Sequence, residues 1–167
     1  MLQVEVNIRV ATQVDIDSLI LLRAYLLDGT SASYSSRSPE DTERWRATYR
    51  DWLTSRLKES DCVLILAAEH RDSGDILGCA TGIIDQRAPA PGSLNGLSGW
   101  VQSVVVSPQW RKRGVAWELM QHLLRWFSNR GIATVALQST TLACSLYESL
   151  GFVGSGERLL LRQEAQT

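Results

Sequence analysis

The segment that most constrains the fold of this chain is Arg111-Lys112-Arg113-Gly114-Val115-Ala116. It follows the apolar run Val101 to Val106 and precedes an amphipathic stretch that reaches Ser128. This order predicts a strand, a turn and the start of a helix. Because Gly114 has no side chain and Ala116 only a methyl group, the N–H groups of the turn and the positive end of the helix can surround an anion. We therefore predict a pyrophosphate-sized site at this turn.

Two other glycine-containing phosphate loops do not match this turn. A Walker loop requires Gly-x-x-x-x-Gly-Lys-Ser/Thr, and a dinucleotide-binding turn requires Gly-x-Gly-x-x-Gly after an early strand. The turn here has a single glycine and lies well past the middle of the chain. Neither kind of nucleotide site is expected.

Apolar periodicity predicts the remaining elements and hence the fold class. The order of elements predicts an α/β fold with a mixed central sheet of about six to seven strands, flanked by about four helices. Strands are predicted at 4–10, 63–68, 76–84, 100–106, 134–137 and 158–161, and helices at 16–27, 39–59, 114–128 and 142–150.

Two motifs resemble those of one family. The spacing Arg111-x-x-Gly114-x-Ala116 is similar to the Q/R-x-x-G-x-G/A signature of the GCN5-related N-acetyltransferases (GNAT), whose turn wraps the pyrophosphate of coenzyme A. A strand and a helix later, Leu146-Tyr147-Glu148-Ser149-Leu150-Gly151-Phe152 resembles the family's Leu-Tyr-Glu-x-Leu-Gly-Phe segment. The resemblance covers nearly the whole chain and is specific from about Trp100 to Phe152. It implies the acyl-CoA N-acyltransferase fold.

The resemblance also implies a reaction and a set of site residues. An amine attacks the thioester of acetyl-CoA directly, and Tyr147 occupies the position that donates a proton to the coenzyme A thiolate. On the strand, an N–H of Val104 or Val105 would face the oxyanion, and the pantetheine arm would pair with the main chain. The implied coenzyme-binding residues are Val104, Val105, Val106, Arg111, Lys112, Arg113, Gly114, Val115, Ala116 and Thr140.

The chain departs from the family pattern at two positions. Trp100 stands where histone-type members carry a glutamate base, which leaves Glu69, Asp85, a water near Gln102, or no base at all. Thr140 stands where many members carry an asparagine that reaches toward the coenzyme arm. A hydroxyl offers one donor where an amide offers two, so Thr140 replaces the asparagine only in part.

Size, charge and cysteine content narrow the remaining possibilities. With 167 residues the chain can bury one core, and we expect a single domain over residues 1–167. A formal charge of −1 argues against nucleic-acid binding, and no run approaches the ~18 apolar residues of a membrane span. Cys62, Cys79 and Cys144 have apolar neighbours and no C-x-x-C spacing, so we expect buried free thiols, no metal and a cytoplasmic location.

The acceptor is predicted only as a class. We expect a small-molecule or peptide amine, and the absence of an acidic cluster makes a polycationic acceptor less favoured. Whether the protein forms a homodimer is left open. The alternative function is a non-catalytic module that binds or senses coenzyme A or acyl-CoA, because the usual glutamate and asparagine are absent. Six aromatic residues are candidates for the acceptor side: Tyr25, Tyr34, Trp45, Tyr49, Trp52 and Trp100.

Overall fold

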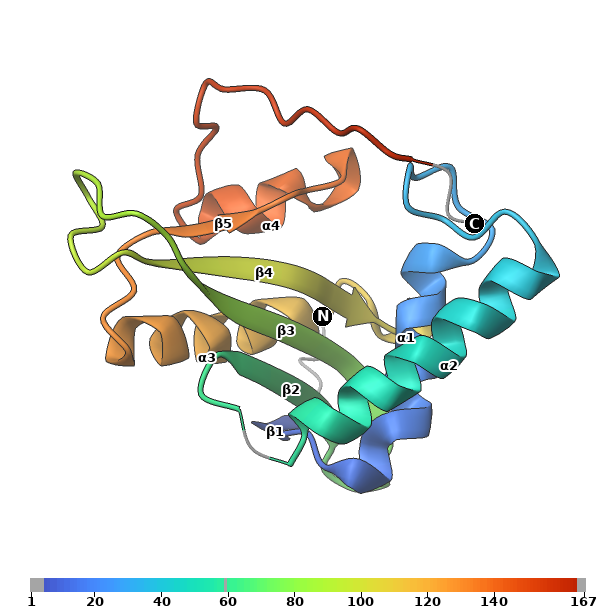
Figure 1. Ribbon diagram of the computed structural model, residues 1–167. Helices are drawn as coiled ribbons and strands as arrows, with labels where there is room; N and C mark the ends of the chain where they lie inside the picture. The colour runs from blue at the N-terminus through green and yellow to red at the C-terminus, as the bar shows by residue number, and fades with distance from the viewer. Residues whose placement is uncertain (1–4, 59, 165–167) are drawn as a thin grey trace.

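The computed structural model describes residues 5–58 and 60–164, and in them the chain forms one five-stranded sheet with the order β1-β2-β3-β4-β5. Neighbouring strands from β1 to β4 are antiparallel, whereas β5 runs parallel to β4. The strands are β1 (Val6–Val10), β2 (Val63–His70), β3 (Ile76–Gln86), β4 (Leu97–Val106) and β5 (Val135–Leu137). Figure 1 shows the long strands β3 and β4 at the centre of the sheet.

Helices cover both faces of this sheet (Figure 1). The helices α1 (Ile16–Leu27) and α2 (Pro39–Arg56) pack on one face, and α3 (Val115–Asn129) packs on the other. A short helix, α4 (Cys144–Ser149), follows β5. The two starts predicted from sequence have a local cause: a capping box joins Thr12 and Asp15 before α1, and the Ser38 hydroxyl accepts the Asp41 N–H at 3.1 Å in the first turn of α2.

The two faces hold two separate apolar cores. The α1/α2 face buries Leu19, Leu53 and Cys79 among others. On the α3 face, Phe127 lies against two glycines of the sheet. A Cβ atom added to Gly82 would lie 2.9 Å from the ring of Phe127, and one added to Gly99 would lie 2.8 Å from it. These glycines therefore let α3 approach the sheet closely enough to bury Phe127.

The prediction of a strand at 158–161 is wrong. Within the described residues the sheet has five strands, fewer than the six to seven expected, and residues 152–164 form no strand or helix. This segment instead runs from the end of α4 across to the loop between α1 and α2 (Figure 1, red), where the Gln163 amide donates to the Ser33 carbonyl at 3.4 Å. Leu159, Leu160 and Leu161 are exposed, so a run of three leucines is not sufficient to form a strand in this sheet. Two predicted element ends, Val4 and Glu59, lie outside the described residues.

The prediction of three buried thiols is correct only for Cys79. Cys62 and Cys144 are exposed. Cys62 lies in the bend before β2, and Cys144 is the first residue of α4. Apolar neighbours in sequence therefore did not indicate burial at these two element boundaries.

None of the described helices has the length and apolar content that a membrane crossing needs.

Candidate active site

A bulge in the central strand β4 shapes the candidate site. Ser103 lies opposite Thr81 and Val101 opposite Gly82, so Gln102 is an extra residue on β4 with no partner of its own. Such a bulge places consecutive side chains on one face of a sheet. Gln102 lines the large cavity on the α1/α2 face, and the neighbouring Ser103 is buried on the same face beneath Arg23 of α1.

Beyond the bulge, one edge of β4 is open. In the described part of the chain β5 pairs with β4 only over residues 99–101, which leaves 103–106 without a strand on that side. The Ser107 N–H donates to the Leu77 carbonyl at 2.9 Å, so by the alternation of an antiparallel pair the amides of Val105 and Ser103 also point toward β3. The N–H groups of Val104 and Val106 therefore point into the gap between β4 and β5.

The turn after β4 presents main-chain donors. Lys112 and Gly114 both adopt left-handed conformations, with φ of 58° and 85°, and Gly114 is the residue before the first turn of α3. Positive φ favours glycine, and here it directs the free N–H groups at the start of α3 outward. The side chain of Val115, only 2% exposed, anchors this helix end in the core.

The arginines of the turn contact the protein itself. The Arg111 Nε donates to the Val106 carbonyl at 3.1 Å, and its guanidinium lies 6.0 Å from the Tyr25 ring centre. The Arg113 guanidinium lies 5.2 Å from the ring centre of Trp110. All three basic side chains are nevertheless exposed, so an anion at this turn would meet them as well as the main-chain N–H groups.

Tyr147 of α4 lies on the α3 face of the sheet, in the same apolar cluster as Val104 and Val106 of the open part of β4. Its ring is half-buried, packs edge-on against Phe152 at 5.9 Å and belongs to the apolar cluster that includes Val104, Val106 and Val115. Burial raises the pKa of the Tyr147 phenol above its ordinary value of 10.0. The hydroxyl therefore keeps its proton at neutral pH.

Thr140 is exposed and precedes the short 3-10 turn that leads into α4. Its carbonyl accepts the Ser139 hydroxyl at 2.7 Å and the Cys144 thiol at 3.5 Å. The Ser139 and Cys144 side chains thus both bond to the main chain of Thr140, one turn before Tyr147.

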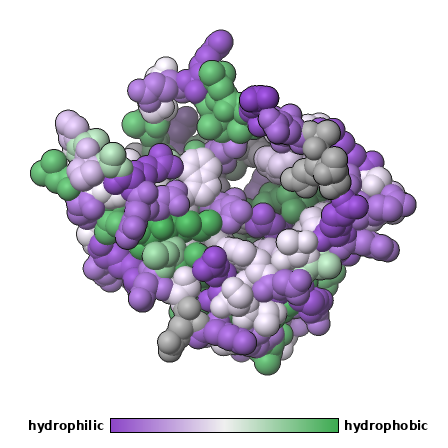
Figure 2. Space-filling model, viewed as in Figure 1, coloured by the Kyte–Doolittle hydropathy of each residue, from purple (hydrophilic) through white to green (hydrophobic). Residues whose placement is uncertain are grey.

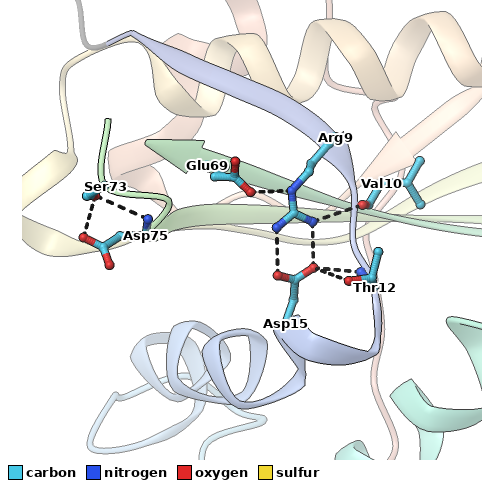
Figure 3. Close-up of polar contacts among 7 residues, drawn as sticks. All are labelled: Arg9, Val10, Thr12, Asp15, Glu69, Ser73 and Asp75. Carbon is cyan, nitrogen blue, oxygen red and sulfur yellow. Dashed lines mark hydrogen bonds and ion pairs between the residues drawn. The ribbon is translucent and has the colours of Figure 1, made fainter. Parts of the chain in front are cut away.

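Glu69, a candidate base, is held in an ion-pair network (Figure 3). Arg9 donates to Glu69 and also, through both Nη atoms, to Asp15 at 2.8 and 2.9 Å. Asp15 is 4% exposed, and its hydrogen bonds to Arg9 hold the pKa of its carboxyl below the usual value. Glu69 therefore serves to join β1, β2 and the start of α1.

Asp85, the other carboxylate candidate, lies opposite Ser98 at the far end of β3 and is 3.5 Å from Arg87. Neither Glu69 nor Asp85 lines the large cavity beside the bulge. Of the positions considered for the base, only Gln102 lines that cavity.

The large cavity has a volume of about 1570 Å³ and lies between α1, α2, the loop that joins them and the 152–164 segment. Figure 2 shows an opening in the surface beneath that segment. Of the six predicted aromatic residues, Tyr25 and Trp100 do not line the cavity, and four do: Tyr34, Trp45, Tyr49 and Trp52.

Sequence reasoning missed the arginines of this cavity. Arg23 follows the buried Leu19 by four residues and therefore lies on the apolar side of α1. A charged residue at such a position was the available signal. Its Nη1 donates to the Ser103 hydroxyl at 2.9 Å, and its guanidinium lies 4.6 Å from the ring centre of Tyr49.

The chain belongs to the acetyltransferase (GNAT) family, whose model matches residues 23–152. The family was predicted from two motifs, and that prediction is confirmed. Within the described residues no three His, Cys, Asp or Glu side chains are grouped to hold a metal ion.

Solved structures of the family share this fold. A GCN5-related N-acetyltransferase from Ralstonia eutropha JMP134 has a TM-score of 0.77 at 21% identity, covering 95% of this chain and 99% of that chain. A predicted acetyltransferase from Clostridium acetobutylicum, solved with acetyl-CoA, has a TM-score of 0.75 at 21% identity, covering 95% and 96%. The predicted GNAT fold is therefore confirmed, with five strands rather than six or seven.

One curated protein matches a shorter stretch of this sequence. The [ribosomal protein bS18]-alanine N-acetyltransferase of Escherichia coli K12 is 38% identical over 53 residues, which are 30% of this chain and 36% of that protein. The match thus spans about a third of the curated relative's length.

Proposed function

We propose that this protein is an acetyl-CoA-dependent N-acetyltransferase that moves the acetyl group to a primary amine by direct attack. The observation that carries the proposal is the open edge of β4, which leads into the left-handed turn at Gly114 and the free N–H groups of α3. The pantetheine arm would pair with the outward-facing main chain of Val104 and Val106. The pyrophosphate would then lie on the 111–116 turn, at the positive end of α3.

The proposal includes a role for each group in the transfer step. The amine nitrogen bonds to the acetyl carbon, a tetrahedral oxyanion forms, and the carbon–sulfur bond then breaks. Of the two amides left open by the sequence, the register favours Val104 as the oxyanion donor, because the Val105 N–H points toward β3. Tyr147 donates its proton to the departing thiolate.

No carboxylate candidate from the sequence lies beside the bulge to accept the proton of the attacking amine. Glu69 and Asp85 lie outside the cavity, and Gln102 is an amide that orients a water but takes no proton at neutral pH. We therefore assign deprotonation to water, with Gln102 as the positioning residue.

The test is the release of free thiol from acetyl-CoA in the presence of a panel of primary amines. The panel includes amino acids, amino sugars, polyamines and a peptide that begins with alanine, since one relative is named for alanine N-acetylation. We expect thiol release above buffer for at least one class, together with formation of the acetylated amine. Binding of acetyl-CoA in a thermal-shift assay without thiol release for any amine would instead favour the non-catalytic coenzyme A module.

A further inference from the structure

The cavity beside the bulge carries an excess of positive charge. Two carboxylates line it, Asp41 and Glu164. Four arginines line it as well: Arg23, Arg37, Arg44 and Arg162. The cavity wall therefore has twice as many cations as anions, although the chain as a whole has a formal charge of −1.

Both carboxylates already have partners. Glu164 accepts from Arg162 at 2.9 Å, and Asp41 accepts the Arg37 main-chain N–H at 3.2 Å in the favourable first turn of α2. Within residues 5–58 and 60–164, the guanidinium groups of Arg23, Arg37 and Arg44 form no ion pair. As far as the described residues show, these three charges are therefore available to a ligand.

Arg23 is the one held nearest to the reacting strand. It is half-buried, and its hydrogen bond to Ser103 fixes it on the face of β4 where Gln102 lines the same cavity. A guanidinium has five N–H donors in a rigid fork, and one of them bonds Ser103. The others match the oxygens of a carboxylate or phosphate, in a partly buried place where such pairing is strong.

An aromatic wall lies next to these cations. Tyr49 stacks on Trp52 with ring centres 5.9 Å apart, and Trp45 lies 6.3 Å from Tyr49. Tyr34 extends the wall from the loop between the two helices. Such surfaces bind apolar or aromatic groups.

We propose that the acceptor is a small primary amine that carries an oxyanion group, a carboxylate or a phosphate, and an apolar or aromatic body. The proposal rests on the proposed function. Arg23 holds the oxyanion so that the amine faces the thioester beside Gln102, while Arg37 and Arg44 attract the anion to the cavity. The same charges repel a polyamine.

Matched acceptors test the charge directly. Phenylalanine and phenylalaninamide differ in the carboxylate, and phosphoethanolamine and ethanolamine differ in the phosphate. We expect kcat/KM to be at least about tenfold higher for the anionic member of one pair, mainly through KM, and the pair that responds identifies the oxyanion. The amide has the less basic amine, so a faster reaction of phenylalanine cannot arise from easier deprotonation.

Variants locate the effect. Arg23→Gln should raise KM for the anionic acceptor about tenfold and leave the neutral partner nearly unchanged. Because Arg23 also contacts Ser103 and Tyr49, its variant is checked for thermal stability and acetyl-CoA binding. Arg37→Gln and Arg44→Gln, at exposed positions, should each raise KM by a smaller factor. Arg50→Gln is the matched control, because Arg50 lies on α2 outside the cavity and pairs with Asp17.

The outcomes separate the two proposals. Equal or faster turnover of the neutral partners, or of spermidine, overturns the anionic acceptor while the transferase function stands. An anionic preference that survives in Arg23→Gln, Arg37→Gln and Arg44→Gln overturns the assignment to this cavity. Failure of every amine to release thiol overturns both.

Discussion

Tyr147 and Arg23 show how the environment of a single side chain decides its use. Burial keeps the Tyr147 phenol protonated, and a neutral phenol can donate to a thiolate. Arg23 is fixed by a hydrogen bond to Ser103 and by its contact with the ring of Tyr49. The motif alone pointed to Tyr147, whereas Arg23 became a candidate only when the fold brought α1 against the bulge.

Tyr147→Phe should lower kcat by about 10²-fold, because loss of a positioned general acid removes that order of rate. Binding of acetyl-CoA should remain nearly unchanged, since the ring packing against Phe152 is kept. In the unmodified protein, kcat should not fall through ionisation of Tyr147 at any pH below about 10, because burial raises the pKa of the phenol above its ordinary value. Steady-state kinetics across pH measure both effects.

Tyr34→Phe is the matched control, because it removes a phenol from the acceptor cavity and should change KM more than kcat. An unchanged kcat in Tyr147→Phe would remove Tyr147 from the mechanism.

At the level of elements, the turn between β4 and α3 was predictable and the bulge was not. The turn is encoded by a glycine, a basic run and a change from strand to helix periodicity, all of which are local. The bulge at Gln102 depends on the register with β3, and one additional residue is hidden within an apolar strand. The missing strand at 158–161 has a similar cause, because pairing requires a free and correctly placed sheet edge that sequence does not specify.

Gly114→Glu should abolish measurable acetyl-CoA binding. The added carboxylate would lie where the pyrophosphate is proposed, and the left-handed backbone would add a strain of about 1 kcal/mol. Calorimetric titration with acetyl-CoA measures the loss.

Gly92→Glu is the matched control, since Gly92 has φ of 86° and, as at Gly114, a Cβ added there would meet no atom within 4 Å. It carries the same backbone strain and charge in a different loop, so it should retain binding. Affinity kept by Gly114→Glu would place the pyrophosphate elsewhere.

The whole molecule depends on two cores that must both stay uncharged, and the core on the α1/α2 face buries two ionisable side chains, Cys79 and Tyr49. Burial raises the pKa of the Cys79 thiol to about 12 and that of the Tyr49 phenol to about 12. Both side chains lie in the core between α1, α2 and the sheet. The overall α/β order was predictable from strand and helix periodicity, and the family was predictable from the two motifs at 111–116 and 146–152. The ionic network of Arg9, Asp15 and Glu69 was not predictable, because Glu69 is 60 residues from Arg9 in the sequence.

The free energy of unfolding should fall as pH rises from about 9 to 12. In this range the unfolded chain releases the protons of Cys79 and Tyr49 while the folded protein keeps them, so alkali favours unfolding. Each group contributes a slope of at most about 1.4 kcal/mol per pH unit. Urea denaturation at several alkaline pH values measures this slope.

Cys79→Ala should reduce the dependence of the unfolding free energy on pH by the contribution of the Cys79 thiol. Cys62→Ala, at an exposed position, should leave this dependence unchanged. A slope that is identical in Cys79→Ala would show that the buried thiol does not govern alkaline stability.

The unpaired residue in β4 divides that strand into two halves with opposite parity. After it, odd-numbered positions such as Ser103 and Val105 face α1; before it, odd-numbered positions such as Gly99 and Val101 face α3. Losing or gaining one residue in either half would exchange the α1 face for the α3 face along that half, whereas a change of two would not. Length variation in this strand is therefore tolerable only in even steps.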